Sequence, residues 1–322
     1  MSDVSVLVVS TSVDVATDAV VQRLTEHDVD VQRLNTEAFP FHQTLAYYPT
    51  LLPDSERLVC DGRALPTPIS IWYRRIRSSA TPDGMDDGVA TFCRQEARAA
   101  LIGGLLAIDA RWMSHPSAIW QAEFKPYQLQ VASAIGLRIP RTVVTNDPSA
   151  VRAASAHFGE LIVKPTRTGH LINNGAEYAV YTSRILGEHL EQLESARWSP
   201  SIYQELIPKK YDIRVTIVGD QCFSAAIDSQ SDPAASVDWR RTNNPYLPHH
   251  VVYLPAALEA ALLRFMRRLG LRFGAIDLIE TSDDDYVFLE VNPNGQWLWL
   301  DEMLGLGITD AVADWLRFAR LS

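Results

Sequence analysis

Two carboxylates and an amide near the C-terminus have the spacing of a metal site. The stretch 272–300 contains two apolar runs rich in β-branched and aromatic residues, and an Asp-rich segment separates them, which predicts a β-hairpin. If the turn is centred on Ser282–Asp285, Asp277 lies opposite Glu290. Because side chains alternate faces along a strand, Glu290 and Asn292 point the same way. All three offer hard oxygen donors, which Mg²⁺ takes alongside the phosphates of a substrate.

The alternative for these acids is a surface hairpin whose carboxylates are merely solvated. Asp277 and Glu290, however, are both embedded in apolar sequence, whereas Asp283, Asp284 and Asp285 suit a turn. Burying a lone charge is costly, so carboxylates in such settings are usually paired or metal-bound. We therefore favour a site in which the two acids act together.

Basic side chains in strand-like sequence could hold an anion. Lys164 stands between Val163 and Pro165 in an apolar run, where a lysine is costly unless it meets an anion. Asp212 and Arg214 share one face of a later predicted strand, because side chains repeat every two residues. For this pair, an ion pair on an edge strand is the alternative. These residue types suit a polyanionic phosphate chain held by cations.

Other basic positions are ambiguous when they are taken alone. Lys125 is at the start of a predicted helix, where most lysines are simply exposed. The Arg240–Arg241 doublet follows a polar loop, and the Arg74–Arg75 doublet follows a predicted strand. The carboxyl end of a strand is where α/β sheets place ligand sites. For both doublets, a solvated basic turn is the alternative.

The motifs around these residues resemble those of the ATP-grasp ligases. Asp277, Glu290 and Asn292 stand in Asp-Leu-Ile and Leu-Glu-Val-Asn-Pro, which is similar to the magnesium triad of that family. The continuation Asn-Pro-Asn-Gly-Gln-Trp-Leu-Trp-Leu resembles the ATP-grasp maturases of graspetides, the microviridin-type ribosomal peptides that are macrocyclised through their side chains. The resemblance implies an α/β ATP-grasp fold, with an N-terminal βαβ (pre-ATP-grasp) domain and two α+β lobes that clamp a nucleotide.

The order of predicted elements agrees with this architecture. Val4–Val9, Asp14–Glu26 and Val29–Leu34 predict strand, helix and strand, which is a βαβ unit with a parallel sheet. No Gly-x-Gly-x-x-Gly follows the first strand, which argues against a dinucleotide-binding domain. We expect three parts, namely an N-terminal domain over 1–117, a central lobe over 118–202 and a C-terminal lobe with the metal triad over 203–322.

The resemblance also assigns roles to individual residues. It implies ATP and Mg²⁺ as cofactors, with Lys125 and Lys164 on the phosphates and Asp277, Glu290 and Asn292 on the metal. Before the first lysine the family often has an asparagine, whereas this chain has a phenylalanine.

The resemblance further implies catalytic arginines, a loop over the phosphates and a hinge segment that binds the nucleoside. Arg214 and Arg240 are the implied catalytic residues, which would orient the reacting phosphate and carboxylate. The polar, glycine-bearing segment 166–175 is predicted to be a mobile loop over the phosphates. A segment similar to the hinge between the lobes would contact adenine and ribose through Gln204, Glu205, Leu206, Ile207, Lys209 and Asp212.

The reaction that the resemblance implies is an ATP-dependent ligation within a peptide. A side-chain carboxylate would be phosphorylated by ATP and then attacked by a Thr or Ser hydroxyl or a Lys amine, which leaves an ester or amide crosslink. The implied partner is a ribosomally made precursor peptide with a leader and an acidic core. Two alternatives stay open. One is a carboxylate–amine ligase for a free amino acid or small molecule, similar to the ribosomal-protein-modifying glutamate ligases, and the other is a non-catalytic ATP-binding scaffold.

Composition argues against several other classes of protein, namely nucleic-acid-binding, disulfide-rich, zinc-binding and membrane-spanning proteins. The 322 residues suffice for two or three domains, and the net charge of −10 argues against a broad nucleic-acid-binding surface. Cys60, Cys93 and Cys222 lack the spacing of a disulfide framework or zinc site, which fits a reducing cytoplasm. No apolar stretch is long enough to cross a membrane. We expect a cytoplasmic enzyme with no nucleic-acid or membrane partner, and a homodimer is one option.

Overall fold

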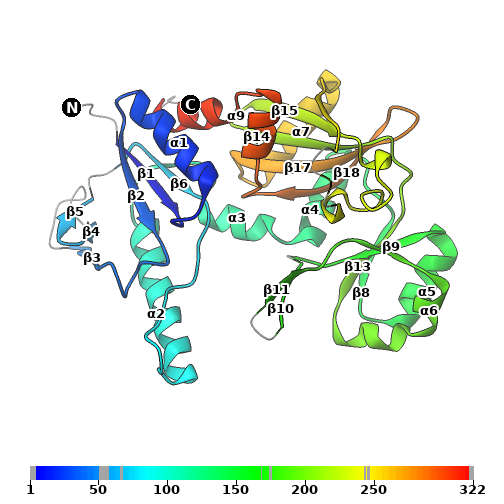
Figure 1. The fold of residues 1–322 in the computed structure, drawn as a ribbon, viewed down its shortest axis with the longest axis horizontal. Helices are drawn as coiled ribbons and strands as arrows, with labels where there is room; N and C mark the ends of the chain where they lie inside the picture. Colours follow the sequence, from blue (N-terminus) through cyan, green and yellow to red (C-terminus); the bar gives the residue numbers. More distant parts are fainter. Residues whose placement is uncertain are drawn as a thin grey trace. The chain divides into compact units, whose positions relative to one another are not determined.

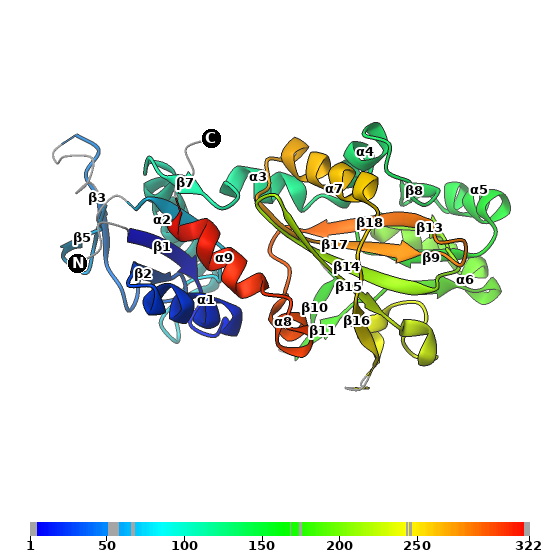
Figure 2. The same ribbon diagram turned by 90° about the horizontal axis from the view of Figure 1, so that it is seen from above.

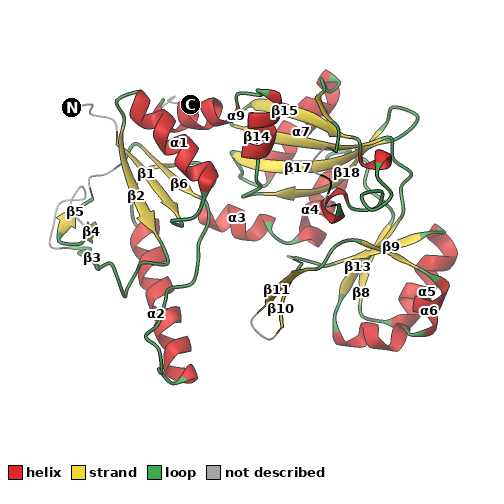
Figure 3. Ribbon diagram, viewed as in Figure 1, coloured by secondary structure: helices red, strands yellow, loops and turns green. Residues whose placement is uncertain are grey.

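The computed structural model describes residues 5–50, 58–65, 68–167, 169–173, 176–242, 244 and 247–318. The chain divides into two compact units. The first consists of Met1–Pro116 together with Gly307–Ser322, and the second of Ser117–Leu306. Figure 1 labels the elements of both units, and Figure 3 colours them by type.

The first unit is built on a parallel sheet with the order β2-β1-β6-β7. Strand β1 (Ser5–Ser10) pairs with β2 (Asp30–Asn35), and helix α1 (Val15–Glu26) connects them. Strands β6 (Ser70–Tyr73) and β7 (Arg111–Trp112) continue the sheet in the same direction. The predicted βαβ unit and its parallel sheet are therefore confirmed.

Helix α2 (Asp87–Leu106) follows β6 and is the longest described helix of this unit. Asp86 caps the N-terminus of this helix. Its carboxylate accepts hydrogen bonds from the N–H groups of Gly88 and Val89 at 3.0 and 3.2 Å, so two donors of the first turn are satisfied. A small antiparallel sheet precedes β6 in the chain, made of β3 (Leu45–Tyr47), β4 (Leu58–Cys60) and β5 (Arg63–Ala64).

The last helix, α9 (Ile308–Arg317), groups with the first unit rather than with the C-terminal lobe in which we expected it. It packs beside α1 and against β1 and β6. Its buried face holds Ile308, Val312 and Leu316, and the Leu316 carbonyl oxygen accepts a hydrogen bond from the Ser70 hydroxyl at 2.7 Å. The apolar face of α9 therefore completes the core of the N-terminal sheet.

The described part of the second unit contains two larger antiparallel sheets and one two-stranded antiparallel hairpin. The first has the order β12-β9-β13-β8, with α5 packed against it and a core of Val151, Leu193 and Tyr203. Beside it lies the two-stranded hairpin β10-β11. The elements of this region are β8 (Thr142–Thr145), α5 (Pro148–Phe158), β9 (Leu161–Lys164), β10 (His170–Asn173), β11 (Ala176–Ala179), β12 (Ser183–Ile185), α6 (Gly187–Glu191) and β13 (Ser201–Glu205).

The other sheet of this unit has the order β16-β15-β14-β17-β18. Helices α7 and α4 lie on one of its faces (Figure 2), where Phe265 of α7 packs edge to face against Phe288 with ring centroids 4.8 Å apart. The elements are α3 (Pro116–Ala122), α4 (Lys125–Ala134), β14 (Tyr211–Val218), β15 (Gln221–Ile227), β16 (His249–Val251), α7 (Ala256–Arg268), β17 (Phe273–Glu280), β18 (Tyr286–Asn292) and α8 (Leu298–Leu304).

The predicted hairpin exists, and a β-bulge sets its register. Beside the turn, Glu280 pairs with Tyr286 and Leu278 with Phe288, which is one residue away from the register we predicted. The register shifts between Asp277 and Leu278, so that Asp277 pairs with Glu290 as predicted. The extra residue is Leu289 of β18. A bulge of this kind bends the strand locally, and the side chains beyond it point to the opposite faces from those that an unbroken alternation would give. The bulge therefore brings Glu290 opposite Asp277 on one face of the sheet.

Candidate functional site

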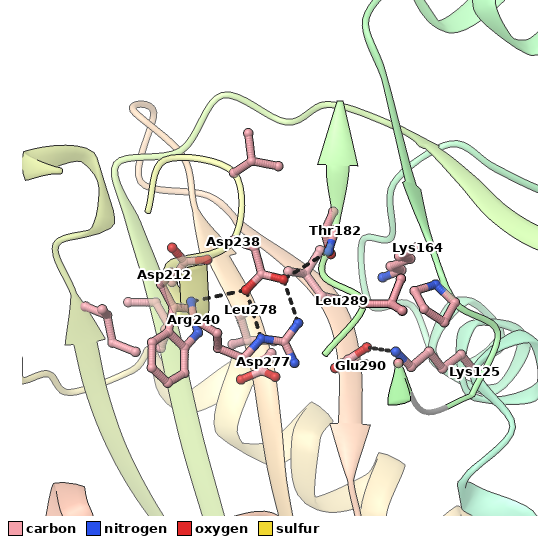
Figure 4. Close-up of a pocket in the computed structure, with 17 residues that line it drawn as sticks. Lys125, Lys164, Thr182, Asp212, Asp238, Arg240, Asp277, Leu278, Leu289 and Glu290 are labelled. Carbon is pink, nitrogen blue, oxygen red and sulfur yellow. Dashed lines mark hydrogen bonds and ion pairs between the residues drawn. The ribbon is translucent and has the colours of Figure 1, made fainter. Parts of the chain in front are cut away.

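A cavity of about 690 Å³, including its open mouth, lies in the second unit (Figure 4). It is bordered by α4, β9, the segment around β11 and β12, and the strands β14, β17 and β18. Six of the residues proposed from the sequence line it, namely Lys125, Lys164, Asp212, Arg240, Asp277 and Glu290. The tertiary structure thus brings together residues that are up to 165 positions apart in the chain.

Lys125 and Lys164 approach Glu290 from the side of the cavity opposite Arg240 (Figure 4). Lys125 Nζ lies 2.8 Å from Glu290 Oε2. Burial by itself raises the pKa of Glu290, but Lys125 and Lys164 outweigh that effect and lower it to about 2. Burial lowers the pKa of Lys164 to about 8, and the charge of Glu290 opposes this change. Two cations are therefore held around one carboxylate, in an environment that favours a further anion.

Asp277, the other carboxylate of the hairpin, is paired with Arg214 on the neighbouring strand. Arg214 Nη1 donates to Asp277 Oδ1 at 2.7 Å, and its Nη2 donates to the carbonyl oxygen of Gln296 at 3.3 Å. Arg214 is 8% exposed, so the guanidinium is held between the sheet and the turn after β18. Arg214 also pairs in register with Asp277, so the two side chains lie on the same face of the sheet.

The turn after β18 can lie this close to Arg214 because it contains Gly295. A Cβ at this position would be 2.4 Å from the Cβ of Ala275 and 3.0 Å from Nη2 of Arg214. Neither neighbour can move freely, since Ala275 is in the middle of β17. A glycine is therefore required where this turn crosses the sheet.

Arg240 is oriented by Asp238, which the sequence reasoning did not single out. The Nε and Nη2 of Arg240 donate to the two carboxylate oxygens of Asp238 at 2.8 and 2.7 Å. The same carboxylate accepts the N–H of Thr182 at 3.1 Å, from the segment before β12 (Figure 4). Asp238 is 5% exposed. Asp238 therefore links Arg240 to the segment before β12. Its position two residues before Arg240 is the sequence feature from which this pairing could have been predicted.

Asp212 lies at the far end of the cavity and is paired with Lys209. Lys209 Nζ is 2.8 and 3.0 Å from the two carboxylate oxygens, and it also donates to the Val237 carbonyl oxygen at 3.2 Å. Of these two predicted residues, Asp212 lines the cavity, whereas Lys209 is held in an ion pair with Asp212 and is not among the described lining residues.

The predicted hinge segment Gln204–Ile207 does not line the cavity among the residues that the structure describes. Several of its polar groups are bonded to residues beside the first sheet of this unit. The Glu205 carboxylate accepts hydrogen bonds from the N–H and Nε of Arg141 at 2.8 and 2.5 Å, and the N–H of Leu206 donates to the Glu160 carbonyl oxygen at 2.8 Å. The Nε2 of Gln204 donates to the Thr142 hydroxyl. The proposed contact of this segment with adenine stays a prediction.

Asn292 shares the site face of β18 with Glu290, as the spacing predicted, because it pairs in register with Ala275 two residues from Asp277. Its side-chain oxygen accepts the N–H of Asn294 at 3.1 Å, and the residue is exposed. It is not among the described residues that line the cavity. Its role as a metal ligand stays a prediction.

The oxygen donors of the site fit a cation that brings further ligands with it. Within the described ranges, no group of three His, Cys, Asp or Glu side chains could hold a metal ion. The candidate set is instead two carboxylates and one amide. Mg²⁺ is commonly bound by one or two carboxylates together with substrate phosphates. The three residues therefore fit Mg²⁺ if a phosphate chain supplies the remaining oxygens.

Helix α4 and the segment after β18 hold the strands of the site in place without lining the cavity with these contacts. Gln128 of α4 accepts the N–H of Val291 and donates to the Val291 carbonyl oxygen, at 2.8 and 2.9 Å, so it satisfies the open edge of β18 between Glu290 and Asn292. The Trp-Leu-Trp tail is also structural. Trp297 packs on Phe273 in the core, and Trp299 packs on Trp239, with ring centroids 5.0 and 5.3 Å apart.

The loop after Lys164 crosses the cavity at Gly169, which lines it. The Gly169 carbonyl oxygen accepts the N–H of Val180 at 2.6 Å, and a Cβ on Gly169 would be 2.2 Å from the Val180 carbonyl oxygen. The predicted polar loop thus borders the cavity, although Thr168, Asn174 and Gly175 lie outside the described residues.

Of the Arg74–Arg75 doublet in the first unit, Arg74 is buried and has a structural role, whereas Arg75 is exposed. Arg74 is 1% exposed, and its Nε lies 3.1 Å from Asp14 Oδ2. Burial lowers the pKa of Arg74 to about 10, while Asp14 acts in the opposite direction. Arg74 therefore joins the end of β6 to the start of α1 within its own unit.

Comparisons with known proteins find similar structures over nearly the whole chain. The model of the MvdD pre-ATP-grasp domain matches residues 5–120. The macrocyclase MdnC from Microcystis aeruginosa MRC, solved with its precursor peptide MdnA, is 31% identical with a TM-score of 0.86, over 97% of this chain and 98% of that one. The macrocyclase MdnB of the same organism is 31% identical with a TM-score of 0.80, over 98% of this chain and 100% of that one.

A third similar structure comes from another organism. The RiPP-associated ATP-grasp ligase of Chryseobacterium gregarium, in complex with ADP and a leader and core peptide, is 27% identical with a TM-score of 0.85, over 97% of this chain and 96% of that one. No curated protein matches the chain. Within the described residues, no helix is both long and apolar enough to span a bilayer.

Proposed function

This chain belongs to the ATP-grasp macrocyclase family, and on that premise we propose that it closes crosslinks within a ribosomally made precursor peptide at the expense of ATP. The enzyme is a ligase of the ATP-grasp type. Its substrate is a peptide with a leader and an acidic core, and its products are intramolecular esters with Thr or Ser, or amides with Lys. ATP and Mg²⁺ are its cofactors.

One observation carries this proposal. Two lysines and an arginine line the same cavity as two half-buried carboxylates that face each other across a hairpin. The cations suit the phosphates of ATP, and the carboxylates suit a divalent cation bound to those phosphates. An acyl-transfer enzyme with its own nucleophile would need a different set of residues.

The chemistry requires no covalent bond to the protein. A carboxylate oxygen of the peptide attacks the γ-phosphorus of ATP, the bond to the β-phosphate oxygen breaks, and an acylphosphate and ADP are formed. A hydroxyl or amine of the same peptide then attacks the acyl carbon, loses its proton and expels inorganic phosphate. The protein contributes by holding the reacting groups in line and by stabilising the charge that develops between them.

The residues singled out from the sequence, whether they line the cavity or lie beside it, have the following parts in this scheme. Lys125 and Lys164 bind the phosphates of ATP. Arg214 and Arg240 orient the transferred phosphoryl group and the acyl oxygens, because a guanidinium binds such anions through two parallel hydrogen bonds. Bound through Asp277, Glu290 and Asn292, Mg²⁺ would supply positive charge for the phosphates.

Support for a peptide substrate comes from the similar structures. MdnC is described as a macrocyclase bound with a precursor peptide, and the Chryseobacterium ligase was solved with ADP and a leader and core peptide. A cytoplasmic location and a homodimer belong to the same proposal, and the three free cysteines fit a reducing compartment. Sedimentation of the purified protein would test the homodimer.

The deciding experiment is a mass measurement on the precursor peptide. Incubated with the enzyme, ATP and Mg²⁺, the peptide should lose the mass of one water for each crosslink. Glu290→Gln removes one metal-binding charge and should abolish the loss. An unchanged peptide mass, together with ADP release triggered by a free amino acid, would instead support a small-molecule carboxylate–amine ligase.

A further inference from the structure

A second cavity lies in the first unit and is separate from the one described above. Including its open mouth, it has a volume of about 450 Å³, and it is formed by the segment after β2, the segment after β6 and one side of α2. Its lining comprises Thr36, Phe39, Ile76, Arg77, Ser78, Ser79, Arg94, Ala97, Arg98, Leu101 and Ile102. Both segments follow the carboxyl ends of parallel strands, which is where open α/β sheets bind ligands.

One buried hydroxyl holds the two segments together. Thr36, which is 2% exposed, accepts the N–H of Arg77 at 3.0 Å, and its hydroxyl donates to the Arg77 carbonyl oxygen at 3.3 Å. This fixes the backbone of Arg77 on the residue that follows β2. The exposed Arg77 side chain is therefore placed at the cavity by a buried anchor rather than by a free loop.

The charge of the lining is opposite to that of the chain. Among the residues that the structure describes, three arginines and no acid line the cavity, although the chain carries 39 acidic and 29 basic residues. Arg94 Nη1 and Nη2 donate to the hydroxyls of Thr81 and Thr91, which leave its charge uncompensated by these contacts. Glu37 acts electrostatically on Arg77, but its carboxylate is bound by the N–H and hydroxyl of Ser12 at 2.7 and 2.6 Å.

The floor of the same cavity is apolar. Phe39, Leu101 and Ile102 are 8%, 3% and 8% exposed. An inorganic anion would gain nothing from this floor, whereas an organic anion would bury its apolar part there. A guanidinium pair prefers planar anions such as carboxylates, which it binds bidentately. The ligand that fits both features has a carboxylate beside an apolar group.

We propose that this cavity, here called the α2 cavity, binds an acidic segment of the precursor peptide. A Glu or Asp carboxylate pairs with Arg77 and Arg94, and an adjacent apolar side chain of the peptide packs on Phe39 and Leu101. The identity of the peptide rests on the function proposed above. The α2 cavity itself does not include any residue that we place in the ATP site.

The test is a double-mutant cycle on peptide binding in the absence of nucleotide. The affinity of a fluorescently labelled precursor peptide is measured for the native enzyme and for Arg77→Ala/Arg94→Ala. The same is done with a peptide whose core acids are replaced by amides. We expect the double variant to bind the acidic peptide about tenfold more weakly, and the neutral peptide within about twofold of the native enzyme.

Arg63→Ala is the matched control, because it removes the same charge from an exposed strand of the same unit outside the α2 cavity. It should leave both affinities unchanged. If the double variant fails to fold, as judged by its thermal unfolding, the exposed Arg77 is replaced alone. The proposal is overturned if the arginine substitutions weaken both peptides equally, or neither, or if Arg63→Ala has the same effect.

Failure of this proposal differs from failure of the proposed function. A native enzyme that dehydrates the peptide while the variant binds it normally would overturn the α2 cavity alone. A peptide that is never dehydrated, yet shows the arginine-dependent difference in binding, would overturn the macrocyclase function and leave the α2 cavity as a peptide site.

Discussion

Lys125 Nζ lies 2.8 Å from Glu290 Oε2, so the lysine expected on a phosphate neutralises a carboxylate expected on Mg²⁺. A divalent cation that reaches Glu290 must therefore compete with Lys125. A phosphate chain removes that competition because it attracts the lysine and supplies oxygens to the cation at the same time. We infer that the metal and the nucleotide bind together much more tightly than either binds alone.

Replacing Lys125 should therefore have effects of opposite sign on the two ligands. Lys125→Met keeps most of the side-chain volume and removes the charge. Binding of Mn²⁺ without nucleotide should become tighter, whereas binding of ATP should weaken by about ten- to a hundredfold through the loss of a charge-assisted hydrogen bond. Titration calorimetry for ATP and electron paramagnetic resonance for Mn²⁺ measure the two.

The control is Lys210→Met, since Lys210 pairs with Glu280 and Asp284 away from the cavity. It should change neither affinity. Unaltered Mn²⁺ binding in Lys125→Met would show that the ion pair does not restrict access to Glu290.

The pH dependence of ATP binding should report on Lys164. Burial lowers the pKa of this lysine to about 8. Below about pH 8 the side chain is protonated and its contribution to ATP binding is complete. Above that pH the lysine must take up a proton when the phosphates bind, so the Kd should rise about tenfold per pH unit until the pKa of the complex is reached.

Calorimetry in two buffers with different ionisation enthalpies measures this proton uptake directly. Lys164→Arg keeps a positive charge at every accessible pH, so it should remove the proton uptake above about pH 8. Equal uptake in the native protein and in this variant would assign the proton to another group.

Asp238 should affect the chemical step more than nucleotide binding. Asp238→Asn removes the charge that holds Arg240 by two hydrogen bonds, and it weakens the bond to the Thr182 N–H. A displaced arginine should lower kcat by about a hundredfold, while KM for ATP stays within about threefold. Steady-state release of ADP with saturating peptide measures both constants.

Asp232→Asn is the matched control for this prediction, because Asp232 binds the Thr242 hydroxyl in the same connection between β15 and β16. It should leave kcat nearly unchanged. Equal losses in the two variants would mean that the whole connection, rather than the orientation of Arg240, had been disturbed.

Two glycine substitutions should change stability in opposite directions. Gly295→Ala would place a Cβ 2.4 Å from that of Ala275, and we expect a loss of about 1–3 kcal/mol in the free energy of unfolding. Gly103→Ala lies in the interior of α2 with nothing within 4 Å of the added Cβ, and should stabilise by about 0.5–1 kcal/mol. Urea unfolding measures both, and a neutral Gly295→Ala would mean that the turn can move off the sheet.

The β17–β18 hairpin shows which features of the site the local sequence pattern predicts and which it does not. The alternation of apolar residues predicted two strands and the pairing of Asp277 with Glu290, which the structure confirms. The same pattern gave a register beside the turn that is one residue off, and the bulge near Leu289 compensates for that error. A bulge depends on how both faces of a strand pack, with Phe288 on α7 and Glu290 in the cavity, and local sequence does not contain that information.

The order of predicted strands and helices and the resemblance to ATP-grasp ligases gave the fold class from the sequence. The charged residues proposed for the site could also be predicted, because a charge inside an apolar run is costly unless it meets an opposite charge. That rule identified Lys164, Asp277 and Glu290 from their neighbours alone. Only the tertiary structure decided which partner each charge has: Lys125 on Glu290, Arg214 on Asp277, and Asp238 on Arg240. It also assigned α9 to the first unit. Such choices depend on contacts between segments far apart in the chain, and a helix with one apolar face does not specify which sheet will cover it.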